Sequence, residues 1–151
     1  MEAVFGDLSS AGLWGLFLAS FLAATVLPFS SEAVLAAAAL GPWSASTLLV
    51  MASAGNWLGG LSTFGLGWLG KPASIARWLR MDPNKALRWQ SAVQRRGAWL
   101  ALLCWVPVIG DPIALALGVF KAKPIPVAIL MLLGKAARYA VVIWAMRVGK
   151  D

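Results

Sequence analysis

Long apolar stretches alternate with short polar ones along this chain, and the alternation predicts a series of helices. The apolar stretches comprise residues 11–27, 33–40, 44–69, 97–106, 112–120 and 124–147. An α-helix rises about 1.5 Å per residue, so 33–40 and 97–106 are too short to cross a hydrocarbon core about 30 Å thick. The stretches 44–69 and 124–147 are long enough. We therefore expect the same order of elements twice: a short helix, a break at proline, a second short helix and a long helix.

The composition places these helices in a membrane. Hydrophobic residues make up 60% of the 151 residues and charged residues 13%, whereas soluble domains contain about 25% charged residues. We therefore expect an all-α, multi-pass integral membrane protein with a single membrane domain over 1–151. The opening MEAVFGD has no basic segment, so a cleaved signal peptide is not expected. Residues 11–27 would reach about 25 Å, and this segment can be a full span or half of a hairpin.

Basic residues give the chain a formal charge of +7, and they concentrate in one polar linker. The cluster consists of Lys71, Arg77, Arg80, Lys85, Arg88, Arg95 and Arg96. A basic loop between apolar blocks is typical of the cytoplasmic side of a membrane protein, so nucleic acid is not an expected partner. Within this amphipathic linker, 70–96, we expect two short helices at the membrane interface, where anionic lipids can bind. Asp82 and Pro83 predict the N-cap and first residue of the second helix.

A shift of 79 positions reveals an internal repeat. It places Pro28 on Pro107, Glu32 on Asp111, Gly55 on Gly134 and Asn56 on Lys135. The linker and the lysines at 121 and 123 flank the second apolar hairpin, which places both of its ends on the cytoplasmic side. The sequence therefore predicts two inverted repeats, about 11–69 and 97–148. Each repeat is expected to contain a re-entrant helical hairpin and a transmembrane helix.

Two isolated carboxylates mark the hairpins. Glu32 and Asp111 lie in apolar tracts, each four residues after a proline. The residues expected to break the hairpins are Pro28, Pro107, Gly110 and Pro112. A broken helix leaves backbone groups that must be covered by protein or water, and acids inside a membrane usually have a function. The alternative is that both acids only cap the helices that follow them.

The long helices contain the complementary polar groups. Lys135 and Arg138 are three residues apart and share one helix face, and Asn56 has the corresponding depth in the other long helix. The predicted substrate-binding or proton-coupling site comprises Glu32, Asn56, Asp111, Lys135 and Arg138. A purely structural pairing of Lys135 or Arg138 with Asp111 is the alternative.

Histidine is absent and Cys104 is the single cysteine. The chain therefore cannot form an intramolecular disulfide, and it lacks the commonest general base and metal ligand. We expect no catalytic residues, no metal site and no cofactor.

Four segments resemble the DedA superfamily of SNARE-associated, VTT-domain membrane proteins, and most closely its short YqaA-like branch. They are LPFSSEAVLAAA, GNWLGGLSTFGLGWLG, RRGAWLALLCWVPVIGDPIALALG and GKAARY. The resemblance implies facing re-entrant hairpins, the bacterial inner membrane, and movement of lipids such as polyprenyl phosphate, with protons as a coupling ion. The larger DedA proteins have an acid and three arginines where this chain has Gly60, Trp68, Cys104 and Gly110. Asp111, Lys135 and Arg138 would then supply a rearranged set of charges.

Three classes of function compete on these grounds. A transporter, flippase or scramblase for lipids or lipid phosphates accounts for the paired breaks together with the buried charges. A non-transporting assembly or envelope-homeostasis factor accounts for the packing glycines and the basic linker. A membrane enzyme is disfavoured because histidine is absent and acids are few. The expected partners are membrane lipids, including polyprenyl phosphate or another anionic lipid, and a chain of this size is also compatible with a homodimer.

Overall fold

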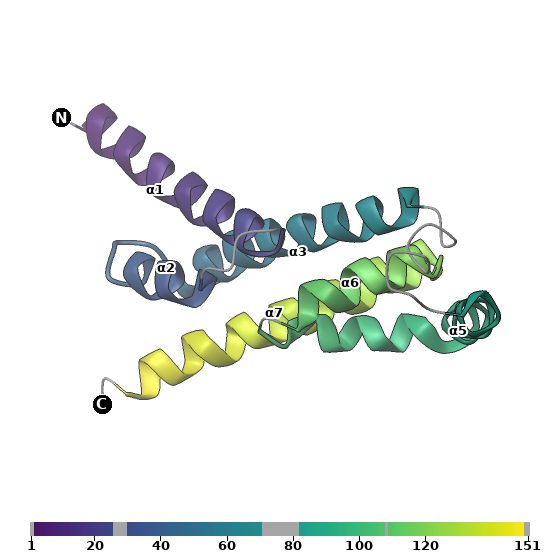
Figure 1. Cartoon of the computed structure of the whole chain (residues 1–151). Coiled ribbons are helices and arrows are strands. Elements are labelled where there is room, and N and C mark those ends of the chain that lie inside the picture. The colour runs from purple at the N-terminus through teal and green to yellow at the C-terminus, as the bar shows by residue number, and fades with distance from the viewer. Residues whose placement is uncertain (1, 26–29, 71–81, 108, 150–151) are drawn as a thin grey trace. The chain divides into compact units, whose positions relative to one another are not determined.

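The computed structural model describes residues 2–25, 30–70, 82–107 and 109–149, and every regular element in this part is helical (Figure 1). The α-helices are α1 (Glu2–Ala23), α2 (Ser31–Ala38), α3 (Ala45–Leu69), α5 (Pro83–Arg96), α6 (Gly110–Val119) and α7 (Pro124–Val148), and η1 (Gly97–Trp105) is a 3₁₀-helix. The all-α prediction is confirmed for these ranges. The predicted break at Pro28 and the first interfacial helix lie outside the described residues.

The chain divides into two compact units. Unit 1 comprises Met1–Gly59 and Lys135–Asp151, and unit 2 comprises Gly60–Gly134. The divisions fall inside α3 and α7, so each long helix contributes one part to each unit.

The helix bounds follow the spacing of the sequence repeat. Helices α3 and α7 both contain 25 residues, and their first residues and last residues are 79 positions apart. Helices α2 and α6 also begin 79 positions apart, at Ser31 and Gly110. The spacing predicted from a few landmarks therefore holds for three helix starts.

Unit 1 has its core where α1, α2, α3 and α7 meet. The buried cluster comprises Leu16, Leu35, Leu48, Ala52, Tyr139 and Ile143. Glycines bring α1 and α3 into backbone contact, because a Cβ at Gly55 or Gly59 would clash with the carbonyl oxygen of Phe17 or Phe21. Such close helix contact through small residues is common in membrane proteins.

In unit 2, glycines bring α3 and α6 into close contact in the same way. A Cβ at Gly67 would meet the carbonyl of Leu115, and one at Gly118 would meet the carbonyl of Phe64. Lys121, with φ of 58°, follows α6 in the left-handed conformation. Its Nζ donates to the carbonyls of Trp68 and Gly70, so Lys121 also caps the C-terminal end of α3.

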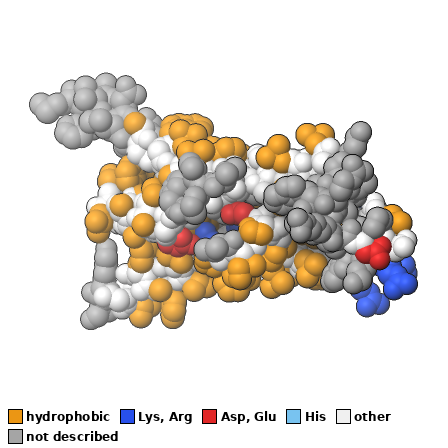
Figure 2. All heavy atoms as spheres, in the orientation of Figure 1, with side chains coloured by type: hydrophobic (Ala, Val, Ile, Leu, Met, Phe, Trp, Pro, Cys, Tyr) orange, Lys and Arg blue, Asp and Glu red, His pale blue; other side chains and the backbone are white. Residues whose placement is uncertain are grey.

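The linker helix α5 begins as predicted. The Asp82 side chain accepts a hydrogen bond from the Asn84 amide at 2.9 Å, and Pro83 is the first helical residue. Figure 2 shows basic side chains gathered over α5, and Arg88, Arg95 and Arg96 are exposed there.

The chain breaks between η1 and α6 at the predicted proline. Pro107 separates the two elements, and the Gly110 amide donates to the Val106 carbonyl at 2.9 Å. A Cβ at Gly110 would clash with the Cys104 carbonyl, so the turn needs glycine there. Pro112 lies in the first turn of α6, where a proline removes no helical hydrogen bond.

Among the described residues, α7 is the one helix that is both long and apolar enough to cross a membrane. Helix α3 has the same length and no charged residue, but its glycine, serine, threonine, tryptophan and asparagine residues keep it below the hydropathy that α7 reaches. The second full span, predicted at 44–69, and the re-entrant form of the hairpins stay predictions.

Candidate functional site

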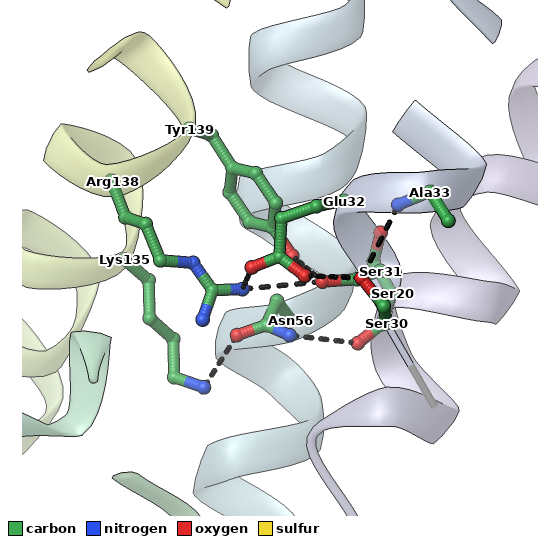
Figure 3. A network of polar contacts seen from close by, with 9 residues as sticks. All are labelled: Ser20, Ser30, Ser31, Glu32, Ala33, Asn56, Lys135, Arg138 and Tyr139. Carbon is green, nitrogen blue, oxygen red and sulfur yellow. Dashed lines mark hydrogen bonds and ion pairs between the residues drawn. The ribbon is translucent and has the colours of Figure 1, made fainter. Parts of the chain in front are cut away.

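Two cations of α7 lie inside unit 1 beside the N-terminal end of α2 (Figure 3). The first is Lys135, which is only 2% exposed. Its Nζ donates to Oδ1 of the buried Asn56 at 2.5 Å, and Nδ2 of Asn56 donates to the backbone oxygen of Ser20 at 3.1 Å. The Asn56 amide therefore links α7 to α1 through α3.

The second cation, Arg138, pairs with Glu32. The Nη2 atom of Arg138 lies 3.0 Å from Oε1 of Glu32 and donates to Oγ of Ser31 at 3.1 Å. The guanidinium carbon lies 4.8 Å from the centroid of the Tyr139 ring, close enough for a cation–π interaction. The Tyr139 hydroxyl donates to the same Ser31 oxygen at 2.7 Å.

Serines organise the start of α2 around Glu32. Ser30 is the N-cap, and its Oγ accepts from the Ala33 amide at 3.4 Å. The same hydroxyl donates to Oε2 of Glu32 at 2.9 Å. Ser30 therefore caps the helix, while Glu32 lies in the first turn, where the helix dipole favours a negative charge.

The fold brings four of the five predicted site residues together in unit 1. They form two pairs within unit 1. Lys135 contacts Asn56, and Arg138, three residues further along α7, contacts Glu32. The fifth residue, Asp111, lies in the first turn of α6 in unit 2. Its approach to Glu32 and its pairing with a cation of α7 stay predictions.

The hydroxyl groups of the network were not predicted from the sequence. Ser30 donates to Glu32, Ser31 accepts from Arg138, and Tyr139 donates to the same Ser31 oxygen. Tyr139 was recognisable as the single tyrosine of the chain, directly after Arg138 in an apolar helix. The two serines directly precede Glu32, in the order that favours a capped helix start.

The network contains groups of the kinds that bind anions. Arginine offers planar donors that match the oxygens of a carboxylate or phosphate, and serine and tyrosine hydroxyls add neutral donors. Within the described part of the chain, no three His, Cys, Asp or Glu side chains come together as metal ligands.

The helical structure and the long apolar α7 fit a membrane protein, and unit 1 contains a charged network. The chain is 40% identical over 131 residues to the inner membrane protein YqaA of Escherichia coli (strain K12), and the match covers 86% of the chain and 87% of YqaA. The same figures hold for YqaA of Shigella flexneri. An uncharacterized protein of Haemophilus influenzae is 32% identical over 140 residues, covering 85% of the chain and 83% of that protein.

The chain therefore belongs to the YqaA family of inner membrane proteins. This result confirms the predicted resemblance to the YqaA-like branch and supports the inner membrane location. No family model matches the chain, and no solved structure matches it.

Proposed function

We propose that this protein moves anionic lipids or lipid phosphates across the inner membrane, as a transporter, flippase or scramblase. The observation on which the proposal rests is the Arg138 guanidinium, which lies inside unit 1 against Glu32 and Ser31. In this proposal Arg138 binds the anionic head group, and the nearby Lys135 adds positive charge. The protein acts on membrane lipids without covalent chemistry, a metal or a cofactor.

Stable packing alone does not account for the charged side chains inside unit 1. Burying an ion pair costs desolvation energy, and an apolar group of similar volume is often as stable or more stable. Ionisable side chains in membrane proteins usually mark the path of a substrate, an ion or a proton. The fork of donors on arginine also suits a phosphate better than the ammonium of lysine does.

The repeat supports a transporter architecture. Inverted repeats with interrupted helices are typical of secondary transporters, whose sites lie where the repeats meet. The helix starts of α2 and α6 and both ends of α3 and α7 keep one spacing. In the proposed mechanism Glu32 or Asp111 changes protonation to release the head group, which makes lipid movement depend on protons.

Proteoliposomes with a panel of labelled lipid phosphates test the proposal. Arg138→Ala should reduce lipid movement about tenfold or more, because hydrogen bonds to charged groups contribute about 1.5–3 kcal/mol. Arg147→Ala is the matched control, since Arg147 is an exposed arginine in the last turn of the same helix. It should move lipid like the parent protein.

A non-transporting assembly factor is the second candidate, and α5 is the observation that favours it. Leu87 is 63% exposed beside the exposed Arg88, which gives α5 an apolar and a basic group for a partner. If Arg138→Ala inserts stably and moves lipid like the parent, this second candidate becomes the better account.

A further inference from the structure

We propose that Glu32 is a resident anion, which occupies the head-group site of Arg138 until the phosphate of a substrate displaces it. This inference rests on the proposed function and adds a competition step to it. The site at the start of α2 is then closed by the protein's own carboxylate.

The contacts of Glu32 are those that a bound phosphate needs. One carboxylate oxygen lies 3.0 Å from Nη2 of Arg138, and the other accepts the hydroxyl of Ser30 at 2.9 Å. An arginine, a serine hydroxyl and a helix N-terminus are a common set of groups around a phosphate. Two oxygens of a phosphate monoester can take the positions of the two oxygens of Glu32.

Glu32 is also more exposed than the groups behind it. Its side chain is 30% exposed, whereas that of Arg138 is 11% exposed and Ser31 is 2% exposed. The carboxylate can therefore leave without opening the core of unit 1.

Arg138 has supports that do not depend on Glu32. Its Nη2 donates to Ser31, and its guanidinium lies against the Tyr139 ring. The hydroxyl of Tyr139, which is fully buried, holds the same Ser31 oxygen at 2.7 Å. Removal of the Glu32 charge should therefore leave the guanidinium in place.

A resident anion has a specific consequence for affinity. The measured dissociation constant of an external anion is raised when the competent state is only partly populated. Neutralising Glu32 removes the competitor, so phosphate should bind more tightly. A carboxylate that only supports the structure would give no such gain.

Anion binding by the purified full-length protein in detergent tests this inference by titration calorimetry. The ligands are inorganic phosphate, a short-chain phosphatidic acid and, as the zwitterionic control, a short-chain phosphatidylcholine. Glu32→Gln should bind phosphatidic acid about tenfold more tightly than the parent. Asp82→Asn removes an equal charge from the N-cap of α5, where asparagine caps equally well, and should leave the affinity unchanged.

Glu32→Asp provides a second measurement that keeps the charge. The shorter side chain should hold Arg138 and Ser30 less well, so its affinity for phosphatidic acid should lie between those of the parent and Glu32→Gln. Equal or weaker binding in either variant would overturn the inference. A gain for inorganic phosphate alone would also overturn it, because the site would then serve free phosphate and not a lipid head group.

The two proposals can fail separately. If the parent protein moves no lipid but Glu32→Gln gains affinity for phosphatidic acid, the transport proposal fails and the resident anion stands. If the parent moves lipid but Glu32→Gln gains no affinity, the resident anion fails alone.

Discussion

Asn56 and Lys135 occupy the same position in two helices of equal length, and they contact each other. Their hydrogen bond joins residues 79 positions apart, which is also the offset between the ends of α3 and α7. Contact between equivalent positions is expected where two helices cross with a local two-fold relation. A site built in this way should accept the ammonium from either helix.

An exchange of the two side chains tests this relation. Asn56→Lys alone brings two buried ammonium groups together and should destabilise the protein by about 3–5 kcal/mol. Asn56→Lys combined with Lys135→Asn restores one ammonium and one amide, and should recover most of the loss. Thermal unfolding in detergent measures both. A double variant less stable than Asn56→Lys would contradict the local two-fold relation.

The charged residues of the site could be predicted from the sequence, but their hydroxyl partners could not. An isolated Glu32 and a mid-helix Lys135 are conspicuous in apolar tracts because burying a charge is costly. Ser31 and Tyr139 are ordinary residues in membrane helices. Their hydrogen bond joins positions 108 apart, so only the tertiary structure pairs them.

At the scale of helices, glycines decide which pairs can approach closely. Gly55 lies against the α1 backbone, while Gly65 of the same helix has nothing within 4 Å of the position its Cβ would take. Substitution of glycine by alanine should therefore lower the stability of the fold at position 55 and raise it at position 65.

Gly55→Ala and Gly65→Ala form a matched pair for thermal unfolding. Gly55→Ala should destabilise the protein by about 1–3 kcal/mol, because the added methyl group forces α1 away from α3. Gly65→Ala should stabilise it by up to about 1 kcal/mol, because alanine favours the helix over glycine. Equal unfolding temperatures for the two variants would show that the α1–α3 contact can relax freely.

Helix extents were predicted well where polar residues bound the apolar stretch. The prediction of 44–69 differs by one residue from α3, and 124–147 differs by one from α7. Helix α1 covers Glu2–Ala23 instead of 11–27 because apolar residues report burial and do not mark helix ends. The 3₁₀ form of η1 had no signal in the sequence, since it depends on local hydrogen bonding.

At the scale of the whole molecule, the distribution of basic residues predicts the orientation of the chain. The linker 70–96 and the turn with Lys121 and Lys123 should both face the cytoplasm, and residues 41–46 should lie on the opposite side.

Single-cysteine labelling in a Cys104→Ala background tests this orientation. Ser91→Cys and Lys123→Cys should react with a membrane-impermeant reagent only from the cytoplasmic side, and Ser46→Cys only from the other. All three positions are exposed, so a failure to label would not come from burial in the protein. Labelling of positions 91 and 123 from opposite sides would contradict the re-entrant hairpin.

The sequence repeats and the compact units divide the chain differently. Repeats at 11–69 and 97–148 are continuous segments, but unit 1 combines the start of the chain with its end. A repeat in sequence records which segments are equivalent and does not specify which of them pack together. That choice depends on the matching of helix surfaces, which places Leu35 of α2 and Ile143 of α7 in one buried cluster.

The discontinuous unit 1 has a consequence for biosynthesis. Ribosomes make α1, α2 and the first part of α3 before unit 2, but Arg138 and Tyr139 follow unit 2 in the chain. Until then Glu32 of the nascent chain lacks Arg138, and Ser31 lacks Tyr139. Unit 2 is continuous, so it can close before the second segment of unit 1 is synthesised. A ribosome that stops before Lys135 therefore leaves an acid-bearing helix start without its arginine, a defect that membrane quality control can recognise.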